Sequence, residues 1–103
     1  MLQAVVNRHA KFQPANGQIT THAICDPANG DYMVVDSGWN EKGRRIYDVV
    51  LHFRLQNDKI YVERDNTDAE IVRELLEAGI DSNSIVLAFN ALPFQRLDDL
   101  AMV

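Results

Sequence analysis

The stretch from Arg45 to Val62 reads RIYDVVLHFRLQNDKIYV. Its first twelve residues show the clearest alternation of apolar and polar side chains in the sequence, which is typical of a half-buried antiparallel strand. Asn57-Asp58 then suits a two-residue hairpin loop. The stretch therefore predicts a β-hairpin whose second strand begins at Lys59.

The loop also predicts the register of this hairpin. It places Phe53 opposite Val62 and His52 opposite Glu63, and it brings Ile60 onto the apolar face, so the register and the apolar pattern agree. The expected core face of the first strand carries Tyr47, Val49, Leu51, Phe53 and Leu55, and the other face carries Ile46, Asp48, Val50, His52, Arg54 and Gln56.

Two more strands are expected upstream, over Ile19 to Cys25 and Tyr32 to Trp39. Turn residues separate them at 26–30, and a charged turn at 40–43 leads into the hairpin. The fold class we predict is α+β, with a four-stranded antiparallel meander sheet, an N-terminal helix and a helix in the C-terminal half packed on it. By its length, we expect the chain of 103 residues to form a single domain.

Helical patterns flank the meander. Leu2, Val5, Val6, His9 and Phe12 share one helical face, which predicts a short N-terminal helix. The second helix is expected after Asn66, where residues 67–70 fit a capping box and Gly79 fits the C′ position of a Schellman cap. The run from Ile85 to Phe89 is apolar, and its periodicity leaves strand and helix open.

Composition limits the possible functions. The net charge is −5 with a pI near 5.0, which argues against direct, tight binding of DNA phosphates. We expect a cytoplasmic protein, because the sequence shows neither a signal peptide nor an apolar run long enough for a membrane. Cys25 is the only cysteine, and we interpret it as a small buried hydrophobe.

The histidines do not form a recognisable metal motif. His9, His22 and His52 lack ligand spacing, so we expect no metal and no cofactor. His52 facing Glu63 is the one pair that could carry out acid–base chemistry, and a small hydrolase built on it is one alternative. We favour the structural interpretation, a cross-strand pair on a solvated face, because no nucleophile accompanies it.

A basic turn follows the only tryptophan. Lys42, Arg44 and Arg45 beside Trp39 could contact single-stranded nucleic acid, which is a second alternative. The structural interpretation is a solvated loop with an arginine stacked on the tryptophan.

Several stretches keep the order of a known family. They are PANGQIT, YMVVDSGW, RIYDVVLH, DKIYVERDNTD, ELLEAGI, SIVLAF and the tail around Pro93 and Arg96. On these stretches, from about Pro14 to Val103, the chain resembles the XisI family, the fdxN-element excision controlling factors of cyanobacteria. It departs from the family pattern in a shortened N-terminal helix, in Asn66 and Asp68, in an extra Gly43, and in Asp98 and Leu100 of the tail.

The resemblance implies a non-enzymatic accessory factor. Members of the family act with a companion called XisH in site-specific excision of a DNA element during heterocyst differentiation. The companion looks nuclease-like, and the recombinase is a separate protein. The expected partners are thus an XisH-like companion or a second copy of the chain, with DNA involved only indirectly and no membrane.

We expect partner contacts on the strand face that the second helix leaves uncovered. Its mixture of aliphatic, aromatic and charged groups is typical of an interface, although a plain solvated face has the same composition. The candidate partner-binding residues are Trp39, Arg45, Ile46, Val50, His52, Arg54, Tyr61 and Glu63.

Overall fold

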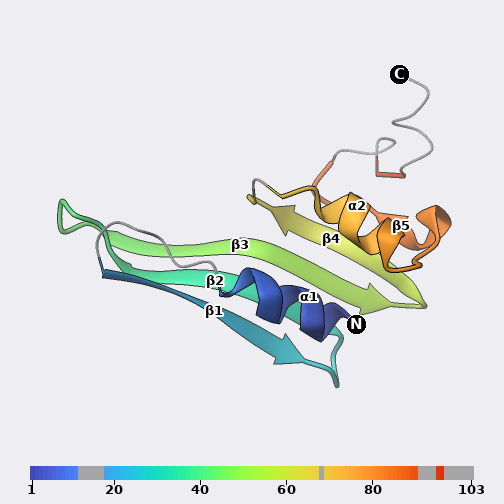
Figure 1. Ribbon diagram of the computed structural model, residues 1–103, viewed down its shortest axis with the longest axis horizontal. Coiled ribbons are helices and arrows are strands. Elements are labelled where there is room, and N and C mark those ends of the chain that lie inside the picture. Colours follow the sequence, from blue (N-terminus) through green and yellow to red (C-terminus); the bar gives the residue numbers. More distant parts are fainter. Residues whose placement is uncertain (12–17, 68, 91–94, 97–103) are drawn as a thin grey trace.

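The computed structural model describes residues 1–11, 18–67, 69–90 and 95–96, and Figure 1 shows their arrangement. Phe12, Asp68 and the tail beyond Arg96 lie outside the described residues. The elements in chain order are α1 (Leu2–His9), β1 (Gln18–Asp26), β2 (Asp31–Trp39), β3 (Arg45–Gln56), β4 (Lys59–Asp65), α2 (Ile71–Glu77), a 3₁₀ turn (Ser82–Ser84) and β5 (Ile85–Val86).

The sheet has five strands in the order β1-β2-β3-β4-β5. The predicted antiparallel meander is confirmed for β1 to β4. The prediction of four strands was wrong by one, because Ile85 and Val86 pair with Ile60 and Tyr61 as a parallel fifth strand. α2 forms the crossover that a parallel neighbour requires, and a two-residue strand is too short for periodicity to reveal.

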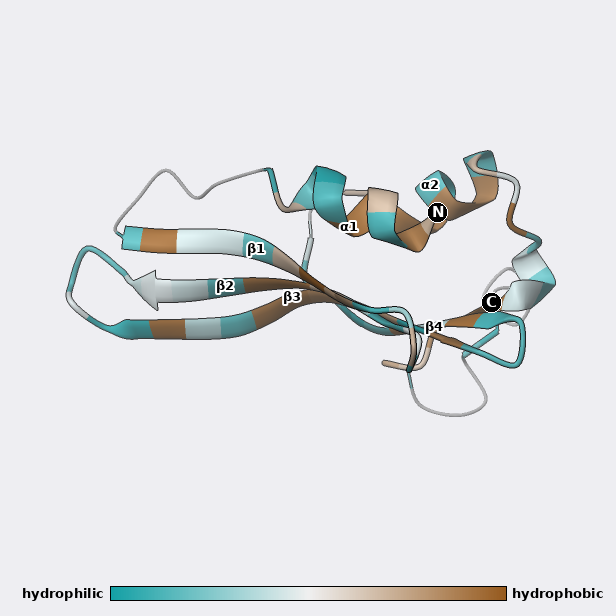
Figure 2. Ribbon diagram, turned by 90° about the horizontal axis from the view of Figure 1, so that it is seen from below, coloured by the Kyte–Doolittle hydropathy of each residue, from teal (hydrophilic) through white to brown (hydrophobic). Residues whose placement is uncertain are grey.

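Both helices lie on the same face of the sheet, as Figure 2 shows. Their apolar residues join one core with the strands below, in which Val6, Leu51, Phe53 and Leu75 have no exposed surface. Cys25 is only partly buried, and it packs against this core. Neither described helix has the length and apolar character needed to cross a bilayer.

The β3–β4 hairpin confirms the predicted loop. Asn57 and Asp58 both have positive φ, as a type I′ turn requires, and Phe53 lies opposite Val62. Beyond that pair a β-bulge inserts Glu63 into β4 as an extra residue. The prediction that His52 faces Glu63 was therefore wrong, and His52 lies opposite Arg64.

A second bulge changes which side chains of β3 lie on each face of the sheet. Val34 pairs with Leu51 but Val35 pairs with Val49, so Val50 is an extra residue in β3. An extra residue reverses the alternation, because side chains alternate with period two. The predicted single face was thus wrong beyond the bulge, since Tyr47 and Val49 lie on the side opposite Leu51.

The sequence predicts the end of α2 correctly but not its start. The predicted capping box is absent, because the helix begins at Ile71 and the Thr67 hydroxyl donates to Asp65 instead, 2.6 Å away. The predicted Schellman cap is confirmed. Gly79 has φ +97°, and Ile80 N–H donates to the carbonyl of Leu75.

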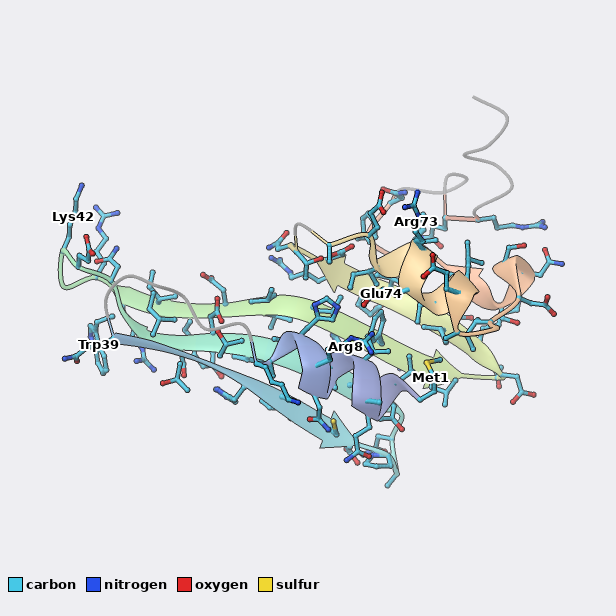
Figure 3. All side chains as sticks on the ribbon, in the orientation of Figure 1. Met1, Arg8, Trp39, Lys42, Arg73 and Glu74 are labelled. Atoms are coloured by element: carbon cyan, nitrogen blue, oxygen red, sulfur yellow. The ribbon has the colours of Figure 1, made fainter. Side chains whose placement is uncertain are left out.

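Glu74 connects the two helices. Its carboxylate lies 2.8 Å from Arg8 Nη2 and 2.7 Å from His9 Nε2, and Figure 3 shows Arg8 and Glu74 between α1 and α2. Burial raises the pKa of Glu74, but the hydrogen bonds and positive charges of His9 and Arg8 outweigh burial and hold that pKa below its ordinary value. The ionised carboxylate therefore stabilises the docking of α1 beside α2.

Candidate partner-binding face

Neither helix lies over the opposite side of the sheet (Figure 2). We call it the open face. Ile24, which is 45% exposed, and Tyr47, which is 71% exposed, illustrate this lack of cover. By register, the larger side chains of the open face are His22, Ile24, Met33, Val35, Trp39, Arg45, Tyr47, Val49, His52, Arg54, Tyr61 and Arg64.

One end of the open face projects beyond the helices. We call residues 38–47, where β2 turns into β3, the projecting end. Trp39 is 51% exposed and Tyr47 is 71% exposed. Neither helix extends over the end of the sheet where Trp39 lies (Figures 1 and 3). Arg45 stacks between them, with its guanidinium carbon 4.6 Å from the Trp39 ring centre and 5.8 Å from that of Tyr47. This aromatic–arginine group is preformed and accessible, as interface anchors are.

A glycine sets the backbone at this end. Gly38 has φ +145°, and a Cβ there would lie 1.9 Å from the carbonyl oxygen of Gln18. Only glycine permits this close approach of β1 to β2. Arg45 Nη1 donates to the Gly38 carbonyl at 3.3 Å, so the stacked arginine is also tied to the strand.

A second polar group lies at the other end of the open face. Asp31 Oδ1 accepts a hydrogen bond from His52 Nε2 at 3.0 Å and lies 3.6 Å from Arg54 Nε. The histidine thus has a carboxylate partner, but it is Asp31 of β2 and not Glu63. The pair on which the hydrolase alternative depended is not formed.

The structure divides the predicted site residues. Five of them lie on the open face by register, namely Trp39, Arg45, His52, Arg54 and Tyr61. Ile46 pairs with Gly38 on the opposite side, Val50 packs against the core, and Glu63 is a bulge residue. Sequence reasoning missed Tyr47 and Asp31, because the first depends on the bulge and the second on the register of β2.

The basic turn has an ordered shape. Asn40 Oδ1 accepts hydrogen bonds from the backbone N–H groups of Lys42 and Arg44, at 2.9 and 3.0 Å. Together with Glu41 these residues line a shallow open hollow. Arg45 is engaged by the aromatic rings, so two cations and one carboxylate remain for any ligand of this turn.

No group of three potential metal ligands occurs among the described residues. His9 is bonded to Glu74, while His22 and His52 point to the open face from different strands.

Comparison with known protein families shows to which family the chain belongs. The model of the XisI family, described as XisI protein, matches residues 1–102. The chain belongs to the XisI family. The match includes α1, which extends the resemblance beyond its expected start near Pro14. None of the curated proteins matches the chain.

Two solved structures of the XisI family have the same fold. A crystal structure of a XisI-like protein from Anabaena variabilis ATCC 29413 is 26% identical, with a TM-score of 0.80 over 92% of this chain and 85% of that chain. A second, of the fdxN element excision controlling factor XisI from the same organism, is 28% identical, with a TM-score of 0.75 over 88% of each chain. The fold and the family identity of the chain therefore agree.

Proposed function

We propose that this XisI family protein is a non-enzymatic accessory factor for site-specific excision of a DNA element, and that it acts by binding a nuclease-like XisH-type companion. Membership of the family and the homologous excision controlling factor support the biological process. The observation that carries the mode of action is the open face, which ends in the exposed group of Trp39, Arg45 and Tyr47.

The chemistry of the open face suits a protein partner. Aromatic and arginine side chains are the residue types that most often dominate binding energy at interfaces. The Asp31–His52–Arg54 group supplies hydrogen-bonding positions at the other end of the same face. The partner would cover apolar side chains such as Ile24, which is 45% exposed.

Co-purification with the XisH-like protein encoded in the same host tests this proposal. Trp39→Ala should weaken the complex by about 2 kcal/mol or more, roughly thirtyfold in Kd, because it truncates an exposed aromatic anchor. Arg54→Ala should weaken it less. Phe89→Ala is the matched control, because Phe89 is also an aromatic with 51% exposure and belongs to none of the strands that form the open face. Unchanged affinity of Trp39→Ala and Arg54→Ala, with normal circular dichroism, would refute the mode of action.

Binding to duplex DNA provides a second test. With only Lys42 and Arg44 available in the basic turn, the slope of log K against log salt should be no steeper than about −1.8. Tight binding by the isolated protein at physiological salt would favour the nucleic-acid alternative. Loss of that binding in a Lys42→Ala/Arg44→Ala double variant would assign it to this turn.

A further inference from the structure

The two edge strands of the sheet, β1 and β5, differ in how well their outer backbone groups are protected from pairing with another strand. β5 has two residues, and an isolated bridge joins Val86 to Arg96. β1 has nine residues, and no described segment pairs with its outer side (Figure 1). Alternate residues of an antiparallel edge strand direct their N–H and C=O groups away from the sheet. β1 therefore presents a long row of backbone groups that a further strand could use.

The composition of β1 lacks the usual protection of an edge. Natural edge strands avoid pairing through lysine, proline, bulges or short length. The strand reads QITTHAICD, with no lysine, arginine or proline and with Asp26 at its end. Its register with β2 runs from Gln18 to Asp26 without a bulge.

We propose that the outer edge of β1 is an interface that pairs with β1 of a second copy, antiparallel and about a two-fold axis at His22. Full overlap of a nine-residue strand with itself requires this centre. The two five-stranded sheets then join into one continuous sheet. Side chains opposite each other share a face, so the open faces of the two copies become one surface and all helices lie on the other side.

The residues of β1 are compatible with one another in this arrangement. Gln18 lies opposite Asp26, where an amide can donate to a carboxylate and where no like charges meet. Thr20 lies opposite Ile24 on the open face, and this covers part of a side chain that is 45% exposed in one copy. The alignment that overlaps all nine residues also sets the only formal charge of each strand opposite a neutral amide, and this self-complementarity favours a second copy as the partner.

Net charge affects the strength of this interface. Each copy carries −5, so the copies repel one another at low ionic strength. β1 itself carries a formal charge only at Asp26, so this repulsion is long-range and salt screens it. Dimerisation should therefore become tighter as salt increases.

A register-specific cross-link tests the proposal directly. In a Cys25→Ala background, His22→Cys places the two thiols opposite each other, with Cα atoms about 4.5–5.5 Å apart, which suits a disulfide. Thr20→Cys is the matched control, because its two copies lie about 13 Å apart along the strands. Under mild oxidation His22→Cys should form a covalent dimer about tenfold faster or more, and equal rates for the two variants would overturn the proposal.

Two measurements on the unmodified chain complete the test. Sedimentation velocity from about 1 to 100 µM should show a reversible monomer–dimer equilibrium. Hydrogen exchange of β1 amides should slow as the concentration increases, while that of β2 amides, which are paired on both sides, should not change. A strict monomer over this range, or a dimer without added protection in β1, would overturn the proposal. Both results are independent of the XisH-type companion.

Discussion

The two ends of β3 have opposite surroundings, although one strand forms both. Phe53 lies under the helices with no exposed surface, whereas Tyr47, six residues earlier, is 71% exposed on the open face. The bulge at Val50 separates the two environments. The folding free energy therefore comes mainly from the covered end. The projecting end keeps its shape through backbone pairing and the stacked Arg45, and its aromatic side chains remain available for contact.

The strongest test of this difference truncates an aromatic residue at each end. Phe53→Ala should lower the free energy of unfolding by about 3–5 kcal/mol, because it leaves a cavity in the core. Tyr47→Ala should change it by no more than about 0.5 kcal/mol, because the ring is exposed. Urea unfolding followed by far-UV circular dichroism measures both. Similar losses for the two variants would show that the projecting end also carries stability.

Gly38 is an exception to this difference between the two ends, because it lies at the projecting end and yet should contribute to stability. Gly38→Ala places a Cβ against the Gln18 carbonyl and should cost about 2 kcal/mol or more. Gly43→Ala is the control, because Gly43 also has positive φ, +77°, but has no neighbour within 4 Å. The control should cost only about 1 kcal/mol. Equal costs would mean that backbone strain alone, and not the approach of β1, makes Gly38 necessary.

The smallest effect concerns the link between the helices over the covered end. Glu74→Gln should cost about 1 kcal/mol at neutral pH, because it removes the charge that Arg8 and His9 contact. The lowered pKa of Glu74 gives the sign of the pH dependence. The contribution is complete above the ordinary carboxyl pKa and disappears as the pH falls through the lowered value.

Stability measured from neutral pH down to about pH 3 should therefore show the wild type and Glu74→Gln converging. Glu70→Gln is the control, because its ion pair with Arg73 is exposed and should contribute little. A difference between wild type and Glu74→Gln that stays constant with pH would contradict the role of the ionised carboxylate.

Much of the fold could be predicted from local patterns. The type I′ loop at Asn57-Asp58, the meander and the Schellman cap at Gly79 depend on residues close together in the chain, and all three are present. The bulges could not be predicted, because Val50 and Glu63 are ordinary strand residues and their extra position depends on the neighbouring strand. The same is true of β5, which exists only because β4 offers it an edge.

The candidate site could likewise be predicted only where it depends on local patterns in the sequence. The exposed Trp39 with its arginine was predicted from adjacency in the sequence, and Arg45 does stack on it. The contact of His52 with Asp31 depends on the register between β2 and β3, which no local pattern specifies. One extra residue in each strand was enough to change the result: Glu63 in β4 removed the predicted partner of His52, and Val50 in β3 moved Tyr47 to the other face.

The position of Trp39 has a spectroscopic consequence. It is the only tryptophan in the chain, and it lies half-exposed at the projecting end, remote from the buried core. Its intrinsic fluorescence therefore reports the polarity around the tip of the sheet and not the packing of the core. Quenching by acrylamide would register a molecule that covers the tip, so the native chain already contains its own optical probe for occupancy of that surface.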